Sequence, residues 1–172
     1  MINFHRNLFE SYLFYFVMEI FIKHLNEAQK NFRIIHHLFY VTFPLVKDKK
    51  ILLKVLINSK KVIVECINTM LHYESMLQRI KIFDDPVLNF KTFEQKCTKW
   101  YGITDEEFNL ILELFETIKK HDESPVEFLK GDNIVILSEN MKPRILSFQD
   151  IKKFVELAKI IFQKTYQRVV FY

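Results

Sequence analysis

Four side chains that could do chemistry together lie close in the sequence: Arg33, His36, His37 and Tyr40. On a helix, Arg33 and His37 share one face because they are four residues apart, and Tyr40 follows one turn after His36. A guanidinium binds phosphate through paired N–H donors, and an imidazole exchanges protons near neutral pH. We therefore take these four residues as a candidate polar site, with RNA phosphate as the substrate that such groups could bind and cleave.

This arrangement resembles the HEPN domains, small helical nucleases that fold as antiparallel bundles. Their motif places four to six residues between an arginine and a histidine, whereas three residues separate Arg33 from His37. The resemblance is thus one of architecture, and it implies RNA processing or RNA binding through these two side chains. The structural alternative is that Arg33 bonds a neighbouring carboxylate or a helix terminus while His37 packs nearby.

Metal and cofactor sites are not expected. Six histidines are present, yet the Glu-x-x-His pairs of a di-iron bundle are not, and His24 with Glu27 forms only half of a helical metal site. The chain has two glycines, Gly102 and Gly131, so the glycine-rich loops that cradle phosphates and dinucleotides are excluded. A hydrolase triad is not expected either, because Ser11, Ser59 and Ser75 lie within predicted helices. Ser124, Ser147 and the paired carboxylates lie at predicted helix ends, where capping explains them.

The two cysteines, Cys66 and Cys97, lie within apolar helical patterns and lack CxxC spacing. This usage predicts buried free thiols and a reducing compartment. We expect a cytoplasmic protein, because Glu10 and Glu19 interrupt an N-terminal apolar run that is shorter than a membrane span.

That N-terminal run, from Leu8 to Val17, is apolar around nearly the whole helix circumference. A helix of this kind is buried on every side. It could lie at the centre of the bundle, pair with a second subunit, or dip into a membrane interface. Its candidate interaction surface consists of Phe9, Tyr12 and Phe16.

Two long amphipathic patterns follow each other in the first half of the chain. Apolar residues spaced by four and three positions predict helices over about 7–45 and 49–82, the first ended by Pro44 and the second capped by Asp48. A break between Asn26 and Asn31 would divide the first helix. Because the connection is short, the two helices are expected to form an antiparallel hairpin.

Shorter elements make up the second half. A third helix is expected to end at Gly102, and Thr104 with Glu107 forms a capping box for a fourth helix over 105–120. Ser124 and Pro125 predict a short helix that stops at Gly131. A minor β-hairpin near 133–146 and a C-terminal helix capped by Ser147 and Asp150 complete the chain.

These patterns predict a single all-α domain over 1–172, a bundle built on the long hairpin with two or three shorter helices. Charge is uneven, since residues 83–132 are acidic and both flanks are basic, which favours attraction between helices. The function expected is a non-catalytic protein-interaction or scaffold module that associates with itself or with another protein. Nucleic acid is a weaker candidate partner, and the HEPN-like role is the alternative.

Overall fold

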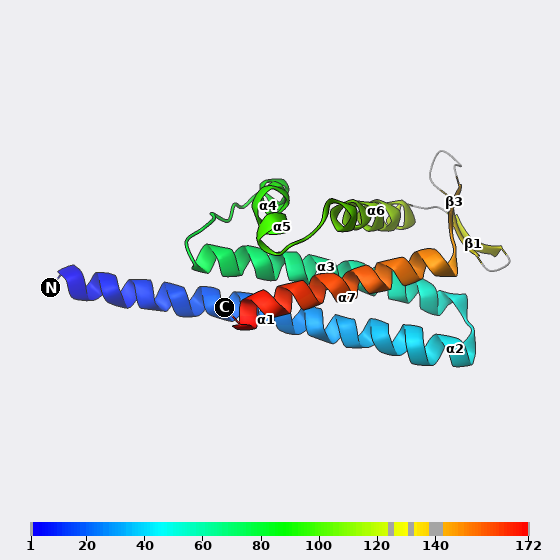
Figure 1. Cartoon of the computed structure of the whole chain (residues 1–172), viewed down its shortest axis with the longest axis horizontal. Helices are drawn as coiled ribbons and strands as arrows, with labels where there is room; N and C mark the ends of the chain where they lie inside the picture. Colours follow the sequence, from blue (N-terminus) through cyan, green and yellow to red (C-terminus); the bar gives the residue numbers. More distant parts are fainter. Residues whose placement is uncertain (1, 124–125, 131–132, 138–142, 172) are drawn as a thin grey trace.

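A computed structural model describes the backbone of residues 2–123, 126–130, 133–137 and 143–171, and the side chains of these residues apart from 2–17, 126–130, 133, 136–137 and 143–144. Two long helices, α1 (Ile2–His37) and α3 (Lys49–Met76), run antiparallel and form the predicted hairpin (Figure 1). The C-terminal helix α7 (Phe148–Phe171) packs against both. The all-α bundle predicted from the sequence is confirmed.

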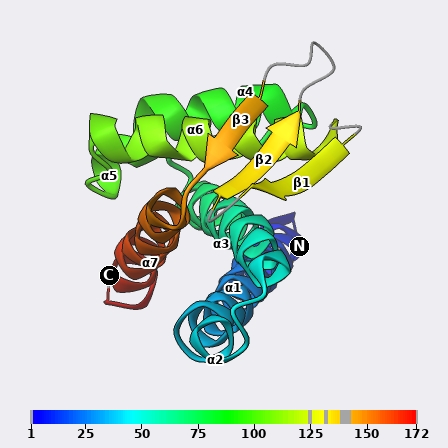
Figure 2. The same cartoon turned by 90° about the vertical axis from the view of Figure 1, so that its right-hand side faces the viewer.

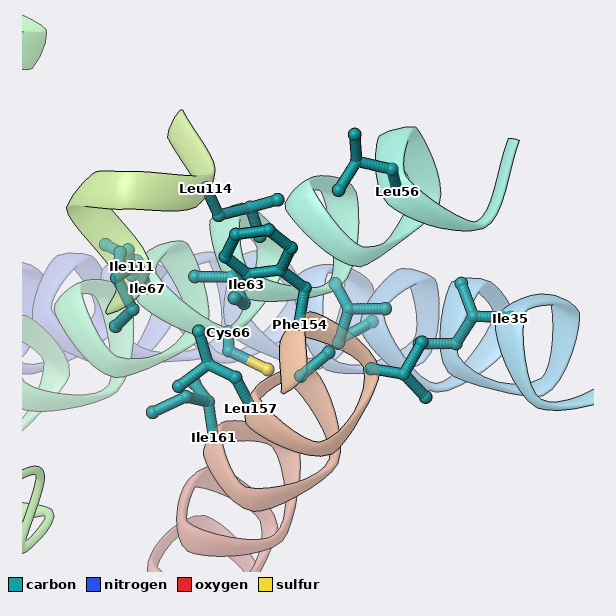
Figure 3. Packing of buried hydrophobic residues seen from close by; sticks show 14 of the residues in the cluster. Ile35, Leu56, Ile63, Cys66, Ile67, Ile111, Leu114, Phe154, Leu157 and Ile161 are labelled. Atoms are coloured by element: carbon teal, nitrogen blue, oxygen red, sulfur yellow. The ribbon is translucent and has the colours of Figure 1, made fainter. Parts of the chain in front are cut away.

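The central helix is α3. Seen end-on in Figure 2, it lies between α1, α7 and the layer that contains α6 (Asp105–Asp122). It supplies buried side chains on several faces, among them Val62, Cys66, Ile67 and Leu71. Figure 3 shows Ile63 and Cys66 of α3 gathered with Leu114 of α6 and Phe154 of α7. These contacts form one core shared by all the long helices.

Helix α1 is continuous through the Asn26–Asn31 region, so the break that would divide it is absent from this described helix. The amide of Asn31 donates to the carbonyl oxygen of Glu27 at 2.8 Å, which satisfies this polar side chain within the helix. At 36 residues, α1 is about 54 Å long at 1.5 Å per residue.

Pro44 does not end the first helix, contrary to the sequence prediction. A π-helical turn, η1 (Leu38–Thr42), comes before the proline, and Phe43 N–H donates to the Leu38 carbonyl five residues earlier. A proline ring normally clashes with the carbonyl four residues before it, and the wider π turn relieves that clash. The short helix α2 (Phe43–Val46) then continues to Lys47, whose φ of 55° ends it.

The second long helix is also shorter than predicted, ending at Met76 instead of residue 82. Gln78 adopts a φ of 57°, and Arg79 N–H donates to the Glu74 carbonyl at 3.0 Å, as in a Schellman motif. The apolar spacing misled the prediction because Ile80 is buried after the helix has ended. Asp48, by contrast, caps the start of α3 as expected, accepting from Lys50 N–H at 2.9 Å.

The third predicted helix consists of α4 (Pro86–Thr92), a π-helical turn η2 (Phe93–Cys97) and α5 (Thr98–Trp100). Gly102 follows it with a φ of 61°, in the left-handed conformation expected at a helix end. Thr104 and Glu107 form the predicted capping box of α6.

One predicted helix is a strand. Residues Val126–Lys130 form β1, which pairs antiparallel with β2 (Asn133–Leu137), and β2 pairs with β3 (Pro143–Leu146). The β-hairpin near 133–146 is thereby confirmed and gains a third strand. The helix predicted from the capping pattern does not form over Val126–Lys130, because all five of these residues pair with β2. The register runs from Val126 opposite Leu137 to Lys130 opposite Asn133. Ser124, Pro125 and Gly131, on which the helix was predicted, lie outside the described residues.

Candidate functional site

The candidate polar site divides over two faces of α1 and η1. His36 and Tyr40 face α7, with their ring centroids 4.9 Å apart. Phe32, one turn earlier, stacks on Phe162 of α7 at 5.4 Å. These side chains, with Val155 and Lys159, line a shallow pocket of about 250 Å³ between α1 and α7.

The phenol of Tyr40 is engaged by a carboxylate. Its hydroxyl donates to Oε1 of Glu156 at 2.7 Å, and this hydrogen bond, with partial burial, raises the pKa of Tyr40 to about 12. Lys159 Nζ lies 3.9 Å from the other carboxylate oxygen of Glu156. Tyr40, Glu156 and Lys159 therefore satisfy one another beside the pocket, and Tyr40 is protonated at neutral pH.

Arg33 and His37 lie away from this pocket. Both are exposed, and Arg33 has no hydrogen bond or ion pair among the side chains that the structure describes. The imidazole Nδ1 of His37 lies 3.2 Å from Oγ1 of Thr42 in the π turn. The four predicted residues are thus neighbours along the helix, but they do not converge on one cleft.

The candidate interaction surface lies on the N-terminal part of α1. Phe9, Tyr12 and Phe16 belong to the segment 2–17, whose helical backbone is described and whose side chains lie outside the described set. Figure 1 shows this segment projecting beyond the rest of the bundle. Of the three settings considered for it, burial at the centre of the bundle is not the one found, because α3 lies there.

The ends of two helices mark where the projection begins. Phe21 of α1 packs edge-on against Tyr73 of α3 at 5.5 Å, and α3 ends three residues after Tyr73. Arg168 of α7 contacts Glu74 of α3, and α7 ends three residues after Arg168. Both neighbours of α1 therefore stop at about the level of Phe21, and residues 2–17 extend roughly 24 Å further as a single helix.

His24 and His72 form a small polar cluster between α1 and α3. The Nδ1 atom of His24 lies 2.6 Å from Oε2 of Glu65, and the two imidazoles stack with centroids 5.4 Å apart. Burial and the nearby His24 lower the pKa of His72. Glu27, which sequence spacing paired with His24, instead contacts Lys30. Within the described part of the chain, no group of three or more histidine, cysteine or carboxylate side chains is placed to hold a metal ion.

A buried ion cluster was missed by sequence reasoning. Glu74 has no exposed surface, and its carboxylate accepts from Arg79 Nη1 and from Arg168 Nε, each at 3.0 Å. Arg168 also donates to the Trp100 carbonyl at 2.8 Å and lies 5.0 Å from the centre of the Tyr101 ring. Glu74 and Arg168 are far apart in the sequence, so no local pattern could have paired them.

Both cysteines are free and buried, as predicted. Burial raises the pKa of the Cys66 thiol to about 12, and burial together with the nearby Glu74 raises that of Cys97 to about 12. A thiol with a raised pKa is a poor nucleophile at neutral pH. The described cysteines therefore act as small apolar residues of the core.

No helix in the described part of the chain is long and apolar enough to cross a membrane. Comparison of the chain with protein-family models, with curated proteins and with solved structures gives no match.

Proposed function

We propose that this protein is a non-catalytic helical interaction module that associates with itself through the N-terminal part of α1. The observation that carries the proposal is the projection of residues 2–17 beyond the ends of α3 and α7. An isolated helix of this length is marginal in water, because helical stability in proteins comes mainly from packing an apolar face.

The sequence of the projection supplies the apolar surface that needs a partner. Ten of its residues are large and apolar: Ile2, Phe4, Leu8, Phe9, Tyr12, Leu13, Phe14, Tyr15, Phe16 and Val17. A second copy of the same segment would cover this surface, and large aromatic residues contribute most to interface energies. The charges of Arg6 and Glu10 balance, so two segments can approach each other without net repulsion.

The chemistry of the described side chains supports a non-catalytic role. The hydrogen bond to Glu156 raises the pKa of Tyr40 further above neutral pH, and burial raises the pKa of both thiols. Catalytic nucleophiles and bases need a pKa near the working pH or below it.

Light scattering after size-exclusion chromatography at several concentrations tests the proposal. We expect a mass twice the 20.9 kDa of the chain, and a return to 20.9 kDa when Phe9, Tyr12 and Phe16 are all replaced by serine. The matched control is Leu45→Ser with Val46→Ser, which removes exposed apolar side chains at the opposite end of the bundle and leaves the dimer intact. A wild-type protein that is monomeric at every concentration overturns the proposal, as does one that floats with liposomes and dimerises only there.

A second candidate function is the HEPN-like one, RNA binding or processing by Arg33 and His37. It rests on the exposure of both side chains one turn apart and on the free guanidinium of Arg33 within the described residues.

A further inference from the structure

Helix α1 carries two stripes of residues on opposite sides, the first apolar and the second aromatic at its start and charged further along. Phe14, Met18, Phe21 and Leu25 continue the stripe that packs against α3, and Phe21 is buried there. Phe9, Tyr12, Phe16, Glu19 and Lys23 form a second stripe with gaps of three and four residues. The two stripes are offset by two positions, about 200° around a helix. Glu19 and Lys23 are exposed, which places the second stripe on the side of α1 that faces away from α3.

The second stripe is complementary to itself when it is reversed. When two copies of the helix lie antiparallel and are centred between Tyr12 and Leu13, position 9 of one copy lies opposite position 16 of the other. Position 6 likewise lies opposite position 19. This pairing brings Phe9 to the level of Phe16, and Arg6 to the level of Glu19. A parallel pair would instead bring Arg6 to the level of Arg6 and Glu19 to that of Glu19. Opposite charges across a helix pair favour one orientation over the other.

In this register the first turn of one α1 reaches the level of residues 20–23 of the other, on the side of α1 that faces away from α3. A pair of single helices covers only one side of each, below the roughly 800 Å² per partner of a typical stable interface, so this register predicts a dimer that forms only at high protein concentration.

We infer that two copies of this chain pair antiparallel through their projecting α1 segments, with the twofold axis between Tyr12 and Leu13. This inference rests on the proposed self-association and adds its orientation and register. The first turn of each copy reaches the level of residues 20–23 of the other, and Arg6 of each pairs with Glu19 of the other.

Disulfide cross-linking tests the orientation. The native cysteines Cys66 and Cys97 are buried and are not expected to form disulfides between copies. A tagged Ile2→Cys variant is mixed with an untagged Lys23→Cys variant and oxidised. We expect a mixed disulfide, since positions 2 and 23 lie at one level in the reversed pair. Ile2→Cys alone should give no covalent dimer, because its two copies would be about 31 Å apart along the axis.

The possible results separate the two proposals. Covalent dimers of Ile2→Cys alone, without the mixed product, would show a parallel pair and overturn the inference while leaving self-association standing. A wild-type chain that stays monomeric in light scattering would overturn both.

A charge exchange tests the register. Arg6→Glu should raise the dimer dissociation constant about 2- to 30-fold, because two exposed ion pairs are lost and like charges meet. Adding Glu19→Arg in the same chain should restore dimerisation. Glu27→Arg, outside the paired segment, is the matched control and should not restore it. Equal dissociation constants for Arg6→Glu and the wild type would overturn the register.

Discussion

Arg168, three residues before the end of α7, donates from Nε to Oε1 of the fully buried Glu74 over 3.0 Å, and Arg79 donates to the other carboxylate oxygen. The cluster fixes the end of α7 beside the end of α3. It also joins both to the segment before Gly102, because Arg168 bonds the Trp100 carbonyl. A separate ion pair, from Lys164 to Glu107 at 2.8 Å, joins α7 to the acidic segment 83–132.

Replacing Glu74 with glutamine should destabilise the fold by about 3 kcal/mol. The largely buried guanidinium of Arg168 would then have no negative charge beside it. Urea denaturation measures the free energy of unfolding. The control is Glu27→Gln, which removes an exposed partner of Lys30 and should change stability by less than about 0.5 kcal/mol. Equal losses in the two variants would contradict a special role for Glu74.

Replacing Tyr101 with phenylalanine should leave stability unchanged or increase it by up to about 1 kcal/mol. Within the described residues its hydroxyl is the one buried side-chain polar atom without a hydrogen-bond partner, and removing such a group removes its desolvation cost. The ring stays in place beside Arg168. Tyr40→Phe is the comparison, since it deletes a hydrogen bond to Glu156 and should be neutral or destabilising. A clear loss of stability in Tyr101→Phe would refute this account.

Acidification should destabilise the protein in part through His72. Burial and His24 lower the pKa of His72 in the folded state, so the unfolded chain binds the proton more readily. The free energy of unfolding should therefore fall as pH drops through the ordinary histidine pKa of about 6.5, and level off below the lowered value. His72→Gln should flatten this slope, whereas an unchanged slope would assign the effect to other groups.

The double variant Arg33→Ala and His37→Ala should bind and cleave RNA no differently from the wild type, because the two side chains are exposed and do not share a cleft with His36 and Tyr40. Filter binding and gel-based cleavage assays with single-stranded RNA provide the measurement. Lys61→Ala, an exposed charge on α3, controls for simple loss of positive charge. Cleavage or binding that disappears only in the double variant would favour the HEPN-like candidate.

Local signals in the sequence were sufficient for much of the fold. The caps at Asp48, Thr104 and Ser147 each depend on residues within three positions, and all three form as predicted. The hairpin of α1 and α3 followed from apolar spacing alone.

What the sequence could not predict depends on contacts between distant residues. The strand β1 forms because β2 supplies its partners, and the Glu74 to Arg168 bond joins residues 94 positions apart. The four polar residues of the candidate site are close in sequence, but the position of α7 decides which of them line the pocket. His36 and Tyr40 face α7, whereas Arg33 and His37 face solvent. For the N-terminal part of α1, the apolar composition indicated that the segment needs a partner. The sequence could not show that α3 and α7 end before they reach it.

The π turn before Pro44 has a consequence for how this chain tolerates changes in length. Five residues, Leu38–Thr42, occupy a turn that an α-helix would complete with fewer, so the turn holds an extra residue. Deleting one residue there would return the turn to regular α-helical geometry, and the residues after it would keep nearly the same orientation, because the wider turn already absorbs the extra residue. The ring of Pro44 would then meet the carbonyl four residues before it, which the wider turn now avoids. A one-residue deletion within Leu38–Thr42 is therefore expected to disturb the helix at Pro44 itself, although the sequence there looks like an ordinary stretch of helix.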